Sequence, residues 1–465
     1  MTTTPIPLSS AKAHPATALF KQAIAAYEAG NIDGAIDGYN SVLKMDPAHV
    51  SAWLNLGTAL RKKGLFEASV AATLRALALR PDDAACYTNL GNCLIDLDRQ
   101  DEALAAHKKA YEIEPNSFLI RRNYGVALRD CGKFEEALTF LDAAEELNAK
   151  KENIAWERAM CLLHMADYAR GWPAFESRWK QAGMRERVSS KAARWQGEDL
   201  AGKTLLIYEE QGFGDSILCS RYIPLIAARG GKVMVEVKKP LHHLFATLEG
   251  MALVAEPGQI TQGFDYHVPM MSLPGIFKTD LTNIPAPAPF KVINAPPPEV
   301  QKLLALGKNK LKVGIVWSGS TTFVNNRKRA TPAERFLRFA EIPNVQLYSL
   351  QKGPCEPELA ACGGEALIPA LGPHLNDFSE TAATLKQLDL VIMTDSAVAH
   401  LAGSLSVPVW NLLHHRPYWL YLEERIDCPW YPSMRLFRQK TPGDWDGVFE
   451  EVARELAKVA QGKHP

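Results

Sequence analysis

The sequence predicts an α-helical array at the N-terminus, followed by an α/β region arranged as two lobes. Three observations lead to this prediction. Pro47, Pro81 and Pro115 recur at 34-residue intervals, which is the spacing of a repeated helix pair. After residue 200, short apolar runs alternate with helical segments, a pattern typical of parallel sheets. A proline-rich stretch, 284–298, separates two such series and is interpreted as a hinge.

The composition excludes several classes of protein. The 465 residues include 52 basic and 52 acidic side chains, and a net charge of zero argues against nucleic acid or an anionic membrane as the main partner. No apolar run reaches the roughly 18 to 20 residues that span a bilayer. The first residues lack the regions of a secretory signal, and the eight cysteines form no Cys-x-x-Cys pair. We therefore expect a cytoplasmic protein without a membrane span or a metal site.

Several columns of residues share the 34-residue period. They comprise small residues, glycines within a helix, and turn residues, namely Ala35, Ser69, Ala103 and Ala137; Gly57, Gly91 and Gly125; and Gly30, Gly64, Asp98 and Gly132. These columns resemble tetratricopeptide repeats, in which small residues let paired helices approach and stacked pairs form a superhelix. The resemblance covers about residues 16–150 as four units, and a degenerate fifth helix pair is expected at 153–179. His107 stands in a column that favours aromatic residues and is predicted to pack in the core.

The repeat array indicates a partner. Arrays of this kind usually bind a peptide or another protein along the concave face, so we expect an acceptor protein or peptide there. The alternative is a capping or dimerising module with no specific client, and a homo-oligomer is possible. In this interpretation the chain has a flexible N-terminus (1–15), repeats (16–180), a first lobe (181–295) and a second lobe (296–465).

The first lobe contains the stretch on which the functional interpretation is centred. Strands are expected at 204–208, 232–237, 253–256 and 266–269, with helices at 216–229 and 240–247. Between the first strand and the first helix lie Gly212 and Gly214, which tolerate unusual backbone angles and let a ligand approach. Asp215 and Ser216 are expected to cap the helix, which puts a carboxylate at the carboxyl end of a strand. The plainer interpretation is a strand–helix turn with a capping aspartate.

The second lobe repeats the alternation, with strands expected at 312–317, 345–350, 388–393 and 407–412. The loop after the first of these contains Ser318 and Gly319, followed by Arg327, Lys328 and Arg329. A glycine turn with hydroxyls and three consecutive cations can hold a diphosphate. A solvated surface turn is the alternative. The next loop contributes Gln351 and Lys352, which could reach a nucleotide.

A third loop ends a strand and opens a helix. It contains Thr394, Asp395 and Ser396, with His400 one turn into the helix. The first N–H groups of that helix favour an anion, while Asp395 would cap the helix or accept from a sugar hydroxyl. For His400, the sequence agrees equally well with a core histidine that binds no ligand. An aromatic-rich segment, 414–432, would stack on a base or line the acceptor entrance, or it would serve as packing under the final helix.

The three loops and their order resemble the GT-B glycosyltransferases of the heptosyltransferase type, family 9. More narrowly, the chain is similar to bacterial proteins that fuse tetratricopeptide repeats to such a domain. The resemblance implies two Rossmann-like lobes and an inverting, metal-independent transfer from a nucleotide-sugar, with no other cofactor. It implies that Asp215 is the general base, and that the 317–329 and 394–400 loops bind the donor. One difference is Asn325-Asn326-Arg327-Lys328-Arg329-Ala330, where such proteins often have Asn-Asp-Arg-x-Arg-Ser.

Three functions remain open. The first is transfer of a sugar to a protein hydroxyl recruited by the repeats, for example on flagellin. The second is a transferase for lipopolysaccharide or another glycan whose repeats recruit a pathway partner. The third is a non-catalytic scaffold with a degenerate sugar-nucleotide domain, for which the altered 325–330 loop is the motive. Eukaryotic-type O-GlcNAc transferases share the two-part layout, but the family-9-like motifs disfavour a close relationship.

Overall fold

The computed structural model describes residues 15–147, 154–180, 192–323 and 325–462. Its contacts divide the chain into an N-terminal unit, Met1–Ile154, and a C-terminal unit, Ala155–Pro465. Of the predicted flexible N-terminus, 1–15, all but Pro15 lies outside the described residues. No helix within the described ranges combines the length and the apolar character that a bilayer crossing needs.

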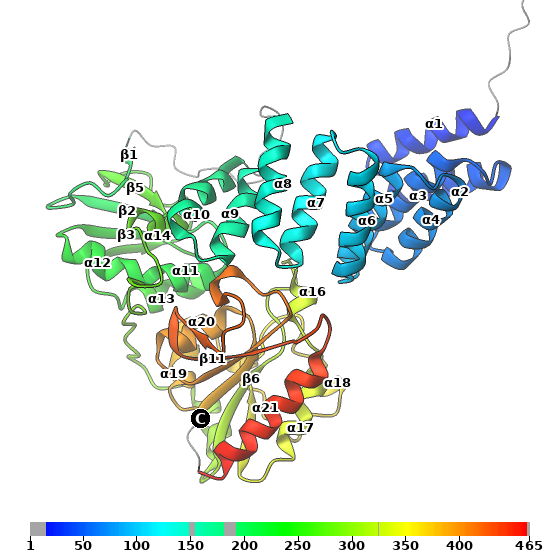
Figure 1. The fold of residues 1–465 in the computed structure, drawn as a ribbon. Helices are drawn as coiled ribbons and strands as arrows, with labels where there is room; N and C mark the ends of the chain where they lie inside the picture. Colours follow the sequence, from blue (N-terminus) through cyan, green and yellow to red (C-terminus); the bar gives the residue numbers. More distant parts are fainter. Residues whose placement is uncertain (1–14, 148–153, 181–191, 324, 463–465) are drawn as a thin grey trace, which may run out of the picture. The chain divides into compact units, whose positions relative to one another are not determined.

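The N-terminal unit is a row of helix hairpins (Figure 1). Its helices are α1 (Pro15–Glu28), α2 (Ile32–Met45), α3 (Val50–Lys62), α4 (Phe66–Leu79), α5 (Ala84–Asp96), α6 (Gln100–Ile113), α7 (Phe118–Asp130) and α8 (Phe134–Leu147). Each helix packs on the next, and the first helices of successive pairs (α1, α3, α5, α7) also contact one another. The predicted helical array is therefore confirmed.

The repeated columns explain this packing. A Cβ atom at Gly91 would lie 2.5 Å from the His107 ring and one at Gly125 would lie 2.9 Å from Leu141, so glycine is needed where the hairpin closes. His107 is buried, as predicted. The turn column adopts the left-handed conformation, with φ of +82° at Gly30 and 60° at Asp98, which shows that Asp98 takes the glycine role in its unit.

The expected fifth hairpin is present as α9 (Ala155–His164) and α10 (Tyr168–Phe175), followed by the 3₁₀ turn η1 (Glu176–Lys180). Its contacts, however, place it in the C-terminal unit. The Trp172 indole donates to the Thr279 carbonyl at 2.7 Å, and its ring lies 5.4 Å from that of Trp419. This hairpin continues the repeat pattern in sequence but packs as part of the α/β region.

The first sheet is entirely parallel, with strand order β1-β5-β2-β3-β4. Its strands are β1 (Ala193–Arg194), β2 (Thr204–Tyr208), β3 (Lys232–Glu236), β4 (Met251–Ala255) and β5 (Tyr266–Pro269). The helices around it are α11 (Phe213–Cys219), α12 (Ile223–Ala228), α13 (His242–Phe245) and α14 (Leu273–Ile276). All four predicted strands are confirmed. Strands β2, β3 and β5 are short apolar runs that the sheet largely buries, whereas β4 lies at the edge and leaves Ala252 and Leu253 exposed.

The second sheet has the order β10-β11-β9-β8-β6-β7. Its strands are β6 (Leu311–Val316), β7 (Val345–Ser349), β8 (Leu390–Thr394), β9 (Val409–Leu413), β10 (Asp427–Cys428) and β11 (Tyr431–Arg438). Among the described strands of this sheet, β10 alone pairs antiparallel, with β11. The four predicted strands are confirmed, whereas β11 begins in the aromatic-rich segment and was not expected.

Helices cover the second sheet and join it to the first. They are α15 (Pro298–Leu304), α16 (Asn326–Arg329), α17 (Leu337–Ala340), α18 (Glu358–Ala361), α19 (Phe378–Leu385), α20 (Ala397–Ser404) and α21 (Trp445–Ala460). Buried Arg221 contacts both regions, donating to the Pro285 and Trp430 carbonyls at 3.1 and 3.0 Å. Helix α11 of the first sheet contacts α20 of the second.

Candidate functional site

The candidate site begins at the carboxyl end of β2. Helix α11 starts at Phe213 with Gly212 as its N-cap, so the prediction that Asp215 and Ser216 are the cap is wrong. Asp215 instead lies in the first helical turn, where its Oδ2 accepts a hydrogen bond from the Gly212 N–H at 3.0 Å. The buried Ser216 hydroxyl donates to the Gly212 carbonyl at 3.3 Å. The carboxylate therefore still accepts a backbone N–H group at the start of α11, but it does so from within the first helical turn and not from the N-cap position.

The ionisation of Asp215 is strongly perturbed. Burial, joined by the negative charges of Asp395 and Glu210, raises the pKa of its carboxyl from 3.8 to about 6, and the hydrogen bond from the Gly212 N–H opposes this rise. Asp215 is half-buried, and a partly desolvated carboxylate near like charges holds its proton more tightly than one in water. The pKa therefore lies where a carboxylate can accept a proton near neutral pH.

Gly214 is required for close approach rather than for backbone freedom. Gly212 has a φ of −87°, an ordinary value, and Gly214 is absent from the described glycines with positive φ. A Cβ atom at Gly214 would lie 2.8 Å from His400 Cδ2 and 3.6 Å from Ala397 Cα. The expectation of unusual backbone angles at this turn is thus wrong, and the glycine instead lets α11 meet α20.

His400 lies at that meeting point. It is buried, and its Nδ1 is 3.1 Å from the Tyr431 hydroxyl. Burial lowers the pKa of the imidazole to about 4, so the ring is neutral at pH 7. A neutral imidazole in contact with both helices can donate or accept one hydrogen bond but contributes no cation to the site.

Asp395 connects the α20 loop to the basic loop. Its Oδ1 accepts from the Tyr421 hydroxyl at 2.6 Å, and its Oδ2 lies 3.4 Å from Arg329 Nη1. The Arg329 guanidinium also lies 4.6 Å from the centre of the Phe323 ring. A Cβ atom at Gly319 would lie 2.6 Å from Arg329 Nη2, so the guanidinium packs closely over this glycine. Arg329 is thereby directed toward Asp395, while Arg327 is exposed and Lys328 half-buried.

Ser318 and Gln351 are held within the protein. The Gln351 Oε1 accepts from the backbone N–H groups of Trp317 and Ser318 at 3.1 and 3.0 Å. Its Nε2 donates to the Ser318 and Lys352 carbonyls at 3.1 and 3.2 Å. The Ser318 hydroxyl accepts from Asn326 Nδ2 at 3.0 Å, and exposed Lys352 reaches the Gly372 carbonyl at 3.4 Å. The buried amide of Gln351 therefore shapes the loop, and its contact with a donor stays a prediction.

The start of α20 contains two hydroxyls with no hydrogen-bonding partner within the described part of the chain. They are Thr394 Oγ1 and Ser396 Oγ, and both residues are buried. Ser396 is the N-cap of α20 but makes no side-chain cap bond. Unsatisfied buried hydroxyls are uncommon in folded proteins. Together with the first N–H groups of α20, they form a set of donors at the edge of the sheet.

Several residues near the site were not predicted. Tyr418, Tyr421 and Tyr431 all come from the aromatic-rich segment, which was singled out without a role for each ring. Trp419 and Trp430 are buried and serve as packing, but they pack against Tyr168 and Trp172 and not under the final helix, α21. Glu210 was missed because nothing local in the sequence shows that it influences Asp215.

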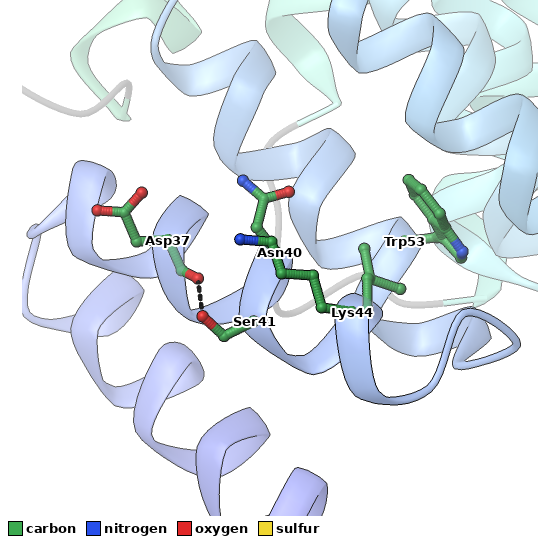
Figure 2. Close-up of a pocket in the computed structure, with 6 residues that line it drawn as sticks. Asp37, Asn40, Ser41, Lys44 and Trp53 are labelled. Carbon is green, nitrogen blue, oxygen red and sulfur yellow. Dashed lines mark hydrogen bonds between the residues drawn. The ribbon is translucent and has the colours of Figure 1, made fainter.

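The N-terminal unit has its own repeated polar feature. Asn55, Asn89 and Asn123 recur every 34 residues and lie on α3, α5 and α7, the helices that contact one another. All three are half-buried. Figure 2 shows a separate hollow on α2 and α3, which is lined by charged, amide, hydroxyl and aromatic side chains, namely Asp37, Asn40, Ser41, Lys44 and Trp53.

Comparisons with known proteins agree with the repeat assignment. The family described as tetratricopeptide repeat matches residues 20–84 and 58–118. Protein FlbA of Caulobacter vibrioides is 28% identical over 353 residues, which cover 69% of this chain and 58% of FlbA. The chain thus spans little more than half the length of that curated relative.

Solved structures match about a third of the chain. MamA MSR-1 C2 is 25% identical, covering 36% of this chain and 95% of that chain, with a TM-score of 0.31. TTC0263, a thermophilic TPR protein in Thermus thermophilus, is 20% identical, covering 36% and 91%, with a TM-score of 0.32. On the family match and the repeated columns together, the N-terminal region of this chain carries tetratricopeptide repeats.

Proposed function

We propose that the protein is an inverting, metal-independent glycosyltransferase that moves a sugar from a nucleotide-sugar to a protein hydroxyl, with the repeats recruiting the acceptor. In this proposal the two sheets are the two lobes of a GT-B fold, and the reaction takes place in the cytoplasm. The observation that carries the proposal is the Asp215 carboxyl, whose pKa is raised to about 6 beside the second sheet's α20 loop. Perturbed carboxyls at the carboxyl ends of strands mark functional sites.

The proposed reaction is a single displacement. Asp215, ionised above pH 6, takes the proton of the acceptor hydroxyl while the oxygen attacks the anomeric carbon and the bond to the diphosphate breaks. The leaving diphosphate is stabilised by Arg327 and Lys328 and by the donors at the start of α20. His400, being neutral, orients rather than neutralises charge.

The repeats support a protein acceptor over a free sugar or lipid. The amides of Asn55, Asn89 and Asn123 recur on neighbouring helices. Each amide has both donors and acceptors, which suits the alternating N–H and C=O groups of an extended peptide. A tetratricopeptide array that holds its client in this way needs no particular side-chain sequence, so several acceptor proteins could share it.

The first test is calorimetric binding of ADP, UDP, GDP and CMP to the purified protein. We expect one nucleotide to bind in the micromolar range, and Arg327→Ala to weaken it about tenfold or more, about 1.4 kcal/mol. Arg335→Ala is the matched control, because Arg335 pairs with Asp446 on the surface of the same sheet region. An equal loss in both variants would show that Arg327 does not touch the nucleotide.

One observation favours a second candidate, a scaffold that binds a nucleotide without turnover. Arg329 is already directed to Asp395, and the 325–330 segment lacks the acid and the hydroxyl of similar proteins. Mass spectrometry of candidate acceptors incubated with the matching nucleotide-sugar separates the two functions. Unmodified acceptors together with tight nucleotide binding would favour the scaffold, and transfer that Asp215→Ala leaves at the wild-type rate would refute Asp215 as the base.

A further inference from the structure

An ion pair that is almost inaccessible to solvent holds the loop between β2 and α11, residues 209–212, which leads to Asp215 and is called the Asp215 loop below. Arg178 comes from η1, at the end of the α9–α10 hairpin, and Glu210 lies between β2 and α11. Their side chains are 1% and 3% exposed. The contact is bidentate, with Arg178 Nε 2.6 Å from Glu210 Oε2 and Nη2 2.9 Å from Oε1. Paired bonds of this kind fix orientation as well as distance.

Every N–H group of the Arg178 guanidinium has an acceptor. Besides the two bonds to Glu210, Nη1 donates to the Phe175 carbonyl at 3.3 Å and to Glu176 at 2.9 Å. Nη2 donates to the Ser272 hydroxyl at 2.7 Å. The planar fork of arginine supplies these five donors, whereas a lysine has three on a single atom. The pattern therefore specifies arginine and not merely a positive charge.

Glu210 in turn joins two loops of the first sheet. Its Oε1 also accepts from the Met271 backbone N–H at 2.9 Å, so one carboxylate holds the loop after β2 to the loop after β5. Five residues further along, the same β2 loop leads to Asp215. The charge of Glu210 is also among the causes that raise the pKa of Asp215, after burial and together with Asp395.

We propose that Arg178 is a positioning residue, which fixes the Asp215 loop through Glu210 from a hairpin that belongs by sequence to the repeats. The catalytic part of this proposal rests on the proposed function. The structural part, that Arg178 holds the loop in place through Glu210, does not. The last repeat hairpin is then part of the transfer machinery and is not only a spacer.

The test uses the full chain with three variants. Arg178→Lys keeps the charge and removes the fork. Glu210→Gln keeps the shape and removes the charge. Arg194→Lys is the matched control, because Arg194 bonds Ser272 at 2.8 Å and Glu176 but makes no hydrogen bond to Glu210 among the contacts described. Circular dichroism first checks that each variant is folded.

Arg178→Lys is expected to lower kcat about tenfold or more, with an unchanged donor KM, because a small misplacement of a base is costly. Arg194→Lys is expected to lower kcat less than about threefold. Glu210→Gln is expected to move the acidic limb of the pH profile to lower pH. The titratable groups that interact with the charge of Asp215 are Asp395, Glu210, Tyr418 and Cys219, and His400 lies against the adjacent Gly214. Glu210→Gln removes one negative charge from this set. Equal losses in the two arginine variants, or an unmoved limb, would overturn the proposal.

A second readout separates this proposal from the proposed function. Carbon-13 NMR of aspartate-labelled protein reports the titration of Asp215, assigned by the loss of its signal in Asp215→Asn. The Asp215 pKa is expected to fall in Glu210→Gln whether or not the protein transfers a sugar. If the wild type proves inactive and the titration still moves, only the glycosyltransferase function fails. An unchanged titration would refute the positioning role by itself.

Discussion

Replacing Asp215 by asparagine is expected to stabilise the C-terminal unit at neutral pH. The folded-state pKa of this carboxyl is raised from 3.8 to about 6. As the pH rises through this window, the unfolded chain loses its proton first, so ionisation favours unfolding. The difference corresponds to about 1.5 kcal/mol at pH 5 and about 3 kcal/mol at pH 7.5, and it vanishes below pH 3.8. An asparagine oxygen can still accept from the Gly212 N–H, so the helix start is kept.

Urea unfolding monitored by tryptophan fluorescence measures this gain. All tryptophans except Trp53 lie in the C-terminal unit, so the signal reports that unit. Asp377→Asn is a control that should change stability in the opposite direction, because the pKa of Asp377 is lowered. Burial alone would raise this pKa, but hydrogen bonds from the start of α19 and from His243 outweigh the effect of burial. The wild type and Asp215→Asn are expected to differ in free energy of unfolding at pH 7.5, and by more than at pH 5. Equal stabilities at pH 7.5, or a difference that does not grow between pH 5 and pH 7.5, would refute the account of a desolvated carboxylate.

Three further outcomes are expected. Gly214→Ala should lower the free energy of unfolding by about 1–3 kcal/mol, because it forces a methyl group against His400. Gly212→Ala should lower it less in the same urea assay, because its Cβ would lie 3.3 Å from one Asp215 oxygen. Residues 1–154 should lose about 2 kcal/mol of stability between pH 7 and pH 5, because burial holds the pKa of His107 at about 4 while the unfolded chain binds the proton. Unfolding followed by circular dichroism should show this loss, and His107→Leu should abolish it. A fragment of residues 155–465 should fold cooperatively, whereas one that begins at 192 should not, since it lacks Tyr168, Trp172 and Phe175, each costing roughly 3–5 kcal/mol when a buried large aromatic is removed.

The strands and repeats were predictable because their signals are local. Apolar runs such as Leu205–Tyr208 end at glycines or charged residues, and the 34-residue columns recur from one unit to the next. Strand β11 was not predictable in the same way. It contains Pro432, which argues against a strand with neighbours on both sides, and it alternates imperfectly between buried and exposed residues.

The candidate site was predictable only in part. Loops at the carboxyl ends of strands pointed to Asp215, Asp395 and His400 individually, and the structure brings α11 and α20 together around Gly214. The partners that set their ionisation come from elsewhere. Arg178 and Glu210 are separated by 32 positions. Arg178 follows helix α10 and Glu210 follows strand β2, so neither a helical nor a strand periodicity predicts that they meet. Buried ion pairs of this type depend on tertiary packing and leave no local trace.

The α9–α10 hairpin has a consequence for how such chains can be recombined. Its sequence belongs with the repeats, while its aromatic side chains form one core with both sheets. An exchange of arrays between proteins of this layout that cuts at the end of the repeat pattern would remove Trp172 and Arg178 from the α/β half. A cut before Ala155 keeps them. The unit that has to be exchanged whole is therefore larger than the repeat motif suggests, because it includes the α9–α10 hairpin as well as both sheets.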